Sequence, residues 1–291
     1  MEPIPNNPPL IVILGPTASG KSALALELAQ QFNGEIIAAD SRTVYKGMDI
    51  GTAKPTRAEQ QEIGHHLLDV VRPDQAFTVS DFQKQANQAI AGIHGRGKVP
   101  FLVGGSGLYI DAVIYNFRFR RPANPEERLK LNRLSVDELQ ALLQEQNIPL
   151  PINYRNPRHL IRSLETRGEA QYRSELRKNT LVIGIDTNRE QLLAKISQRV
   201  DAMVHNGFVP ELKALVQQYG WEAPALQAPG YRAFRDYLAG SITLDEAKQR
   251  FVANDMQLAK RQRTWFRRNK DIHWICKKAE AVDLITTLLN K

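Results

Sequence analysis

Short apolar runs alternate with amphipathic stretches over the first 117 residues. The runs at 10–14, 35–39 and 99–103 are almost wholly apolar, a pattern typical of strands that are covered on both faces. Residues 21–32 and 79–93 lie between these runs and repeat their apolar positions at helical spacing. Because strand and helix alternate, the pattern predicts an α/β fold with a parallel sheet flanked by helices.

The pattern changes near residue 118, where arginines and prolines interrupt it and polar, helical sequence follows. Asn156 and Pro157 form a favourable helix start inside this part. The apolar run at 181–185 then predicts a strand that returns to the sheet. We therefore expect a helical insertion in one domain, with these bounds: 1–117 and 181–291 for a P-loop NTPase-like core with C-terminal helices, and 118–180 for the insertion.

The composition excludes several classes of protein. The chain has 291 residues, of which 42% are hydrophobic and 24% charged, as in ordinary globular proteins and unlike fibrous or disordered chains. The longest apolar run, 10–14, is far shorter than the roughly 20 residues of a membrane-spanning helix. The single cysteine, Cys276, excludes an internal disulfide and a cysteine-rich zinc site. We expect a cytoplasmic protein without a membrane partner.

Positive charge is concentrated in two stretches of the chain. The net charge is +8, and residues 118–178 hold 13 basic against 8 acidic residues. Residues 255–278 hold 8 basic against 2 acidic residues. Such a surface suits a polyanion, nucleic acid first, although charge alone fits a merely solvated surface equally well.

A phosphate-binding loop follows the first predicted strand directly. Residues 15–22, GPTASGKS, match G-x-x-x-x-G-K-[ST], in which backbone N–H groups and a helix N-terminus bind phosphate. Lys21 adds a cation, and the Ser22 hydroxyl can bind Mg²⁺. The motif is shared with ATP-binding proteins and indicates a diphosphate or triphosphate, without indicating hydrolysis. The predicted phosphate-binding residues are Gly15, Pro16, Thr17, Ala18, Ser19, Gly20, Lys21 and Ser22.

One acidic residue is well placed to act beside this loop. Asp40 follows the apolar run at 35–39, and parallel sheets bind ligands at the carboxyl ends of their strands. The run at 99–103 offers no such acid and continues into glycines. Asp40 either serves as a general base or caps the turn at Ser41, and the sequence leaves both open.

Six segments, in this order along the chain, resemble bacterial tRNA dimethylallyltransferases, also called tRNA isopentenyltransferases. They are GPTASGKS (15–22), DSRTVYKGMDIGTAKP (40–55), HHLLDV (65–70), GGSGLY (104–109), PGYR (229–232) and QLAKRQRTWFR (257–267). The resemblance covers nearly the whole chain. It implies a Mg²⁺-dependent transfer of a dimethylallyl group from dimethylallyl diphosphate to the exocyclic amine of the adenosine 3′ of the anticodon.

The resemblance also implies roles for individual residues. The implied catalytic residues are Asp40, Lys21, Ser106 and Arg199, and Ser22 is the implied metal ligand. The implied tRNA-binding residues are Asp40, Ser41, Arg42, Thr43, Ser106, Arg128, Arg158, Arg162, Gly230, Tyr231, Arg232, Lys260, Arg263 and Arg267. We expect the tRNA anticodon stem-loop and dimethylallyl diphosphate as partners, and a monomer, since one chain carries one site.

The chain departs from the family pattern at three places. Ser106 stands where the family usually has threonine, which keeps the hydroxyl. Asp255 and Met256 replace the usual Thr-Arg, removing a basic residue and adding an acid. The insertion is shorter than usual, and one cysteine cannot form the C-terminal zinc finger of other members.

From residue 189 the pattern is helical to the end of the chain, apart from a break near 220–230. Arg199 borders the apolar face of the predicted helix at 189–205. A charge on that face needs a partner, either the substrate diphosphate or a structural salt bridge.

A second predicted helix, at 257–270, separates two faces. Its predicted inward face consists of Leu258, Ala259, Gln262, Trp265 and Phe266. Its predicted basic stripe consists of Lys260, Arg263, Arg267 and Lys270, and it suits either an RNA backbone or solvent. We expect Trp221, Trp265 and Trp274 in the core.

Two other functions fit part of the sequence. A small-molecule P-loop kinase shares the phosphate loop and the acid after the second strand, but it does not account for the basic C-terminal helix. A non-catalytic RNA-binding module, with a loop that only senses a ligand, accounts for the charge alone.

Overall fold

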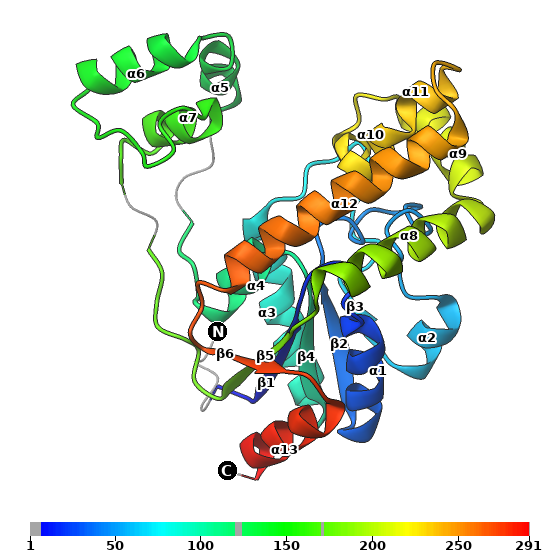
Figure 1. The fold of residues 1–291 in the computed structure, drawn as a ribbon. Helices are drawn as coiled ribbons and strands as arrows, with labels where there is room; N and C mark the ends of the chain where they lie inside the picture. Colours follow the sequence, from blue (N-terminus) through cyan, green and yellow to red (C-terminus); the bar gives the residue numbers. More distant parts are fainter. Residues whose placement is uncertain (1–6, 120–123, 170–171, 291) are drawn as a thin grey trace. The chain divides into compact units, whose positions relative to one another are not determined.

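The computed structural model describes residues 7–119, 124–169 and 172–290 (Figure 1). The chain divides into two compact units, one of Met1–Tyr115 with Leu176–Lys291 and one of Asn116–Glu175. The predicted insertion, 118–180, therefore overlaps the second unit but extends into the first, where the strand after it begins at Thr180. Residues 120–123 of the predicted break lie outside the described residues.

A six-stranded parallel sheet forms the centre of the larger unit, as predicted. Its order is β3-β2-β4-β1-β5-β6. The strands are β1 (Leu10–Leu14), β2 (Gly34–Ala39), β3 (His65–His66), β4 (Val99–Gly104), β5 (Thr180–Ile185) and β6 (Ile272–Ile275). Strand β6 contradicts the prediction of helix alone after residue 189. Only its first and last residues are buried, and so short an edge strand gives no clear periodic pattern.

Helices cover both faces of the sheet (Figure 1). α1 (Lys21–Gln31) and α13 (Lys278–Leu289) share one apolar core with the sheet. α3 (Val79–Gly95) and α4 (Gly107–Ile114) pack against each other and against the central strands on the opposite face. A short helix, α2 (Arg57–Glu62), precedes β3. No helix in the described residues is long and apolar enough to cross a membrane.

A second apolar core lies among the C-terminal helices. These are α8 (Arg189–His205), α9 (Phe208–Tyr219), η1 (Pro224–Gln227), α10 (Pro229–Ala233), α11 (Arg235–Leu238) and α12 (Leu244–Phe266). The Phe208 ring lies at its centre, edge-on to three other rings with centroids 5.0–5.8 Å away. Val44, Tyr45 and Met48 join this core from the loop after β2. The core therefore fixes the 40–55 segment next to α8 and α9.

Helix α12 differs from its prediction at both ends. It begins at Leu244, where Thr243 and Glu246 form a capping box, and it ends at Phe266, so Lys270 lies outside it. Ala259 and Phe266 are buried as predicted, but Leu258 and Trp265 are 36% and 40% exposed. Both side chains still face the protein: Leu258 lines a cavity together with Gln262, and Trp265 lies over Gly107, where a Cβ atom would meet it at 2.4 Å. Their inward direction was predicted correctly, but their partial exposure was not predicted.

The smaller unit contains three helices around its own apolar core. They are α5 (Pro125–Leu131), α6 (Val136–Glu145) and α7 (Pro157–Glu165). Asn156 caps α7 by accepting a hydrogen bond from the Arg158 N–H, and Pro157 opens the helix, as predicted. Leu139, Leu143 and Leu160 are fully buried between the helices. A core of this kind accounts for a helical body separate from the sheet.

Candidate active site

The phosphate loop connects β1 to α1 in a tight turn. The Ser19 N–H donates to the Pro16 carbonyl at 3.2 Å, and Ala18 and Gly20 have positive φ angles of 59° and 90°. A Cβ atom on Gly15 would lie 2.8 Å from the Ser19 Oγ. No side chain caps the N-terminus of α1. The first N–H groups of the helix are thus available to an anion.

A cavity of about 590 Å³ opens beside this loop. The loop, α1, the ends of β2 and β4, α8 and α12 contribute to its lining. The predicted residues Lys21, Ser22, Asp40 and Arg199 all line it, although they come from distant parts of the chain. The sheet and the C-terminal helices thus bring a phosphate loop, two cations and a carboxylate into one cavity.

Lys21 lies beside charges of both signs. Its Nζ donates to the Pro16 carbonyl at 3.2 Å. Burial lowers the pKa of Lys21 to about 8; the charge of Asp40 raises it, and that of Arg199 lowers it to a smaller extent. Because burial is the main cause, an anion bound in the cavity would favour the protonated amine.

Of the two partners left open for Arg199, the structure shows the salt bridge: its Nη2 forms an ion pair with the Oδ2 of Asp255 on α12. Arg199 also lines the cavity, and its contact with the substrate diphosphate stays a prediction. Its Nε is buried and has no hydrogen-bond partner among the described residues. Burial raises the pKa of Asp255, which the charge of Arg199 opposes. Asp255 therefore anchors the guanidinium that borders the phosphate loop.

Asp40 uses one carboxylate oxygen to hold its own turn. Its Oδ1 accepts a hydrogen bond from the Arg42 N–H at 2.8 Å. The next N–H, of Ser41, donates to the Ser106 Oγ at 3.0 Å. Ser106 thus supports the turn that presents Asp40, and it does not itself line the cavity. One Asp40 oxygen caps the turn, and the side chain still borders the cavity, so both predicted roles are compatible with the geometry.

Gln262 connects α12 to the phosphate loop. Its Oε1 accepts from the Thr17 N–H at 2.8 Å, and its Nε2 donates to the Gly105 carbonyl at 3.0 Å. A Cβ atom on Gly105 would approach Gln262 to 2.4 Å, which accounts for the glycine. The sequence placed Gln262 on the inner face of the helix but gave no sign of this bridge.

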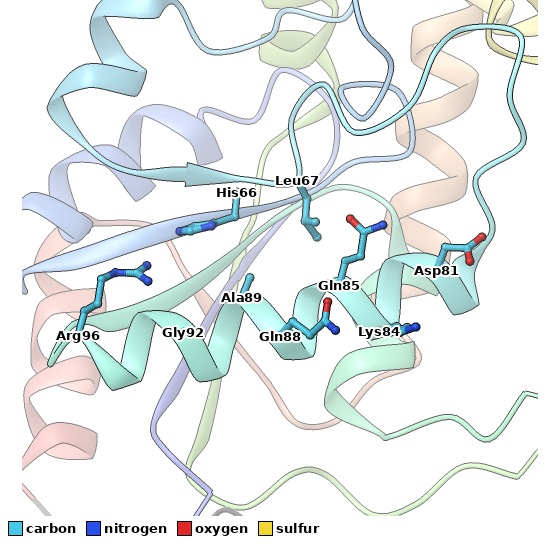
Figure 2. Close-up of a pocket in the computed structure, with 9 residues that line it drawn as sticks. All are labelled: His66, Leu67, Asp81, Lys84, Gln85, Gln88, Ala89, Gly92 and Arg96. Atoms are coloured by element: carbon cyan, nitrogen blue, oxygen red, sulfur yellow. The ribbon is translucent and has the colours of Figure 1, made fainter. Parts of the chain in front are cut away.

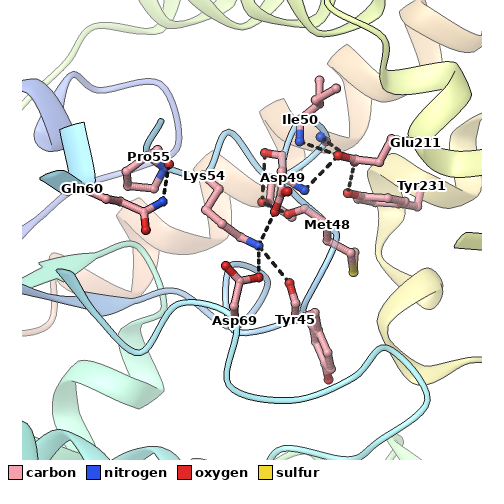
Figure 3. A network of polar contacts seen from close by, with 12 residues as sticks. Tyr45, Met48, Asp49, Ile50, Lys54, Pro55, Gln60, Asp69, Glu211 and Tyr231 are labelled. Atoms are coloured by element: carbon pink, nitrogen blue, oxygen red, sulfur yellow. Dashed lines mark hydrogen bonds and ion pairs between the residues drawn. The ribbon is translucent and has the colours of Figure 1, made fainter. Parts of the chain in front are cut away.

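A polar network fixes the segment that follows Asp40 (Figure 3). The buried Lys54 donates to Asp49, Asp69 and the Tyr45 carbonyl. Glu211 accepts from the backbone N–H groups of residues 49–51 at 2.6–3.0 Å. This network ties one wall of the cavity to α9.

Three residues with an implied tRNA contact lie on α10 beside this network. The Tyr231 hydroxyl donates to Glu211 at 3.0 Å, and the side chain is only 2% exposed. Burial and the charge of Glu211 raise the pKa of Tyr231 well above its ordinary value. Gly230 is buried against Phe251, and Arg232 is exposed. Gly230 and Tyr231 therefore present almost no surface to RNA and instead support the cavity wall.

The predicted basic stripe is divided between two surfaces. Arg263 and Arg267 line a small cavity together with Trp274, which is 39% exposed and not in the core as predicted. Lys260 lies in a separate groove of about 500 Å³ with Arg261 and Arg268. The predicted stripe did not include Arg261 and Arg268, and Arg268 lies beyond the end of α12 at Phe266.

The basic residues of the smaller unit also differ in their surroundings. Arg128 and Arg162 each form an ion pair with the buried carboxylate of Glu165, at 2.9 and 3.1 Å. Arg158 is exposed. Arg158 is therefore available to a polyanion, whereas Arg128 and Arg162 also hold α5 and α7 together.

Another cavity lies elsewhere and has a different character (Figure 2). It measures about 650 Å³ and lies between β3 and α3, with His66 and Arg96 at one end. Glu35 pairs with His66, Arg96 and Lys98. Burial alone would raise the pKa of Glu35, but these hydrogen bonds lower it to about 2. Glu35 offsets only part of the positive charge at this end, but it already holds these three side chains, so they are less available to a phosphate.

Comparison with known proteins gives a consistent result over almost the whole chain. Residues 43–269 match the sequence profile described as IPP transferase. The tRNA dimethylallyltransferase of Staphylococcus epidermidis is 38% identical, over 98% of this chain and 92% of that protein. That of a Roseiflexus species is 43% identical over 95% of both.

Solved structures agree with the sequence matches. The full-length tRNA isopentenylpyrophosphate transferase of Bacillus halodurans has a TM-score of 0.76 at 37% identity, covering 98% of this chain and 97% of that one. A eukaryotic dimethylallyltransferase acting on tRNA has a TM-score of 0.77 at 28% identity, covering 92% of this chain and 74% of that one. Sequence and fold therefore point to the same group of proteins.

Proposed function

This chain belongs to the IPP transferase family, and from that premise we propose the reaction that its cavity performs. A dimethylallyl group passes from dimethylallyl diphosphate to the exocyclic amine of the adenosine 3′ of the anticodon in tRNA, and diphosphate is released. The observation that carries this proposal is the single cavity in which the phosphate loop, Lys21 and Arg199 face Asp40. All these residues lie on one chain, so the site is complete in a monomer.

The diphosphate leaving group requires positive charge in the part of the cavity wall that contains the phosphate loop, Lys21 and Arg199. As the bond between the allyl carbon and the diphosphate oxygen breaks, negative charge grows on the diphosphate. The uncapped N–H groups at the start of α1, together with Lys21 and Arg199, stabilise that charge where it develops. Lys21 and Arg199 make this wall complementary to the anion, and a bound diphosphate would favour the protonated form of Lys21.

A divalent cation fits one edge of this wall. The Ser22 hydroxyl is exposed at the first turn of α1 and offers an oxygen ligand of the kind Mg²⁺ prefers. The described residues contain no cluster of three or more histidine, cysteine or acidic side chains that could hold a metal. Ser22 and the diphosphate oxygens would therefore hold Mg²⁺, which would neutralise part of the leaving-group charge.

The acceptor amine must lose a proton as it bonds to carbon. Asp40 lines the same cavity, and a carboxylate within hydrogen-bond reach of the amine takes that proton. The adenosine must also leave the stack of the anticodon loop to reach the cavity. The exposed basic residues of α12, together with Arg158 of the smaller unit, supply contacts to the RNA backbone in this proposal.

Labelled substrates test this function directly. The purified chain is incubated with unmodified tRNA, Mg²⁺ and either labelled dimethylallyl diphosphate or γ-labelled ATP. We expect label to reach the tRNA from the allyl donor only, with one equivalent of diphosphate released. Label passing from ATP to an acceptor would select the kinase, and tRNA binding without transfer would select the binding module.

The pKa of Lys21 predicts a pH effect on substrate binding. Without ligand, Lys21 loses its proton near pH 8, and a bound diphosphate anion raises its pKa again. Binding of dimethylallyl diphosphate should therefore take up almost no proton at Lys21 at pH 7 and close to one at pH 9. Affinity should fall up to about tenfold per pH unit above 8.

Calorimetry in two buffers of different ionisation enthalpy measures this proton uptake. Lys21→Met is the matched control, because it removes the titrating amine and should take up no proton at pH 9. Equal uptake in the variant and the wild type would assign the effect to another group.

A further inference from the structure

A small cavity adjoins the catalytic one across the phosphate loop. It measures about 140 Å³ and is formed by the end of β5, the loop after it, β6 and the C-terminal end of α12. Two neighbouring pairs of residues connect the cavities. Pro16 lines this cavity and Thr17 the catalytic one, and Arg263 lines this cavity and Gln262 the catalytic one. The small cavity therefore lies within a few residues of the proposed site of transfer.

Its cationic residues have no ionic partner. Arg263 and Arg267, one helical turn apart, both line it, and neither forms an ion pair with any described residue. Asp186 lines the same cavity, and its Oδ1 accepts from the Thr187 N–H at 2.9 Å. The two guanidinium groups outnumber this one carboxylate, so the lining is net positive and favours an anion.

Two further side chains make this a built site. Trp274 is 39% exposed although its ring lies over Gly184, where a Cβ atom would meet it at 2.8 Å. The glycine thus lets the indole approach β5 closely. Thr187 is only 8% exposed, and its Oγ1 is buried without a hydrogen-bond partner among the described residues. A buried, unpaired hydroxyl is costly, so its presence on the cavity lining indicates a ligand that pairs with it.

We propose that this cavity binds a nucleotide of the substrate RNA close to the modified adenosine. The Trp274 ring stacks on the base, Arg263 and Arg267 contact a backbone phosphate, and the Thr187 hydroxyl pairs with a polar atom of the base or ribose. The inference rests on the proposed function, since it takes tRNA as the substrate. The cavity is smaller than the roughly 300–1,000 Å³ of sites that enclose whole small molecules, so it would hold only part of a nucleotide.

The reaction itself creates a need for such a site. When the adenosine leaves the stack, its neighbours lose a stacking partner, which costs a few kcal/mol of unstacking in related systems. An aromatic ring that replaces the lost partner offsets this cost and tolerates any base, because every base has a π face. Trp274 supplies such a ring beside the catalytic cavity.

The test uses an anticodon stem-loop RNA with 2-aminopurine at one position at a time around the target adenosine. We expect the fluorescence at one position to be quenched on binding, and this quenching to be lost in Trp274→Leu. The dissociation constant for RNA should rise by roughly tenfold in Trp274→Leu and much less in Trp274→Phe, which keeps a ring. The KM for dimethylallyl diphosphate should not change in either variant.

The other residues supply independent measurements. Arg263→Gln and Arg267→Gln should each reduce the slope of log affinity against log salt by about 0.7–0.9, the contribution of one phosphate contact. Lys213→Gln, which removes an exposed cation on α9, should leave that slope unchanged. Thr187→Val should weaken RNA binding severalfold without lowering the unfolding temperature, since it removes an unpaired hydroxyl.

Several outcomes would overturn the inference. One is wild-type RNA affinity and quenching in both Trp274→Leu and Thr187→Val. Another is saturable binding of adenosine monophosphate at this cavity with unchanged RNA affinity in the variants, which would make it a site for a free nucleotide. Failure of the proposed function is seen separately, because the wild-type chain would then transfer no dimethylallyl group to the same RNA.

Discussion

Lys21→Ala is expected to slow dimethylallyl transfer by about 10³-fold while the affinity for tRNA stays within a fewfold of wild type. The leaving diphosphate loses a cation at the point where its charge develops, and one such group contributes about 10²–10³-fold or more in other enzymes. The RNA backbone is held by other residues in the proposed function. Single-turnover rates and a tRNA-binding isotherm on the same preparation separate the two effects.

The same substitution should stabilise the ligand-free protein. Burial lowers the pKa of Lys21 to about 8, so the fold disfavours the charged amine at pH 7. Alanine removes that cost, and we expect a higher unfolding temperature together with the lost activity. Lys213→Ala, on an exposed position of α9, is the matched control and should change neither quantity. If a folded Lys21→Ala protein lost tRNA affinity by a factor comparable to its loss of rate, Lys21 would also bind tRNA, and the prediction would be wrong.

Local sequence was sufficient to predict the parts of the site that lie on one continuous segment. The phosphate loop needs only its glycines, its lysine and its place between a strand and a helix, and all three can be read in order along the chain. Asp40 was found because the carboxyl ends of parallel strands meet at one edge. Arg199 was found because a charge beside an apolar helical face is conspicuous.

The parts that depend on two distant segments were not predicted. Asp255 looked like a loss of basic charge, yet it pairs with Arg199, 56 residues earlier in the chain. A signal was present, because Asp255 lies four residues after the buried Phe251 and four before the buried Ala259. A carboxylate on that face requires a cation, and Arg199 stands on the matching face of α8. Which two helices pack together is decided by the tertiary fold, so the pair itself could not be deduced.

The exposure of the tryptophan side chains was predicted wrongly, because it also depends on contacts between distant segments. Trp265 and Trp274 are apolar enough for a core, but each covers a glycine with one part of its ring and leaves the rest exposed. The Trp265 indole N–H donates to Asp111 at 2.9 Å, a contact from an element far away in the sequence. Helical spacing gives the direction of a side chain, whereas exposure depends on what the fold places opposite it.

Asp40→Asn is expected to slow the step after substrate binding by about 10²–10⁴-fold, or about 3–5 kcal/mol. The amide keeps an oxygen that accepts from the Arg42 N–H, so the turn and the unfolding temperature should be retained. It cannot take the proton that the adenosine amine loses. Single-turnover rates at saturating substrates report this step, and both dissociation constants should change little.

Three controls separate a base from the other roles of this carboxylate. Asp40 raises the pKa of Lys21, so its loss lowers that pKa further, and rates measured at pH 6.5 keep Lys21 protonated. Ser106→Ala removes the acceptor of the Ser41 N–H and disturbs the same turn without touching the carboxylate. If Asp40 acts as the base, Asp40→Asn stays slow at pH 6.5 and at high Mg²⁺, while Ser106→Ala loses only a fewfold in rate. If the rate of Asp40→Asn recovers at high Mg²⁺, Asp40 helps to bind the metal ion. If the rate of Asp40→Asn is near that of the wild type, Asp40 only caps the turn.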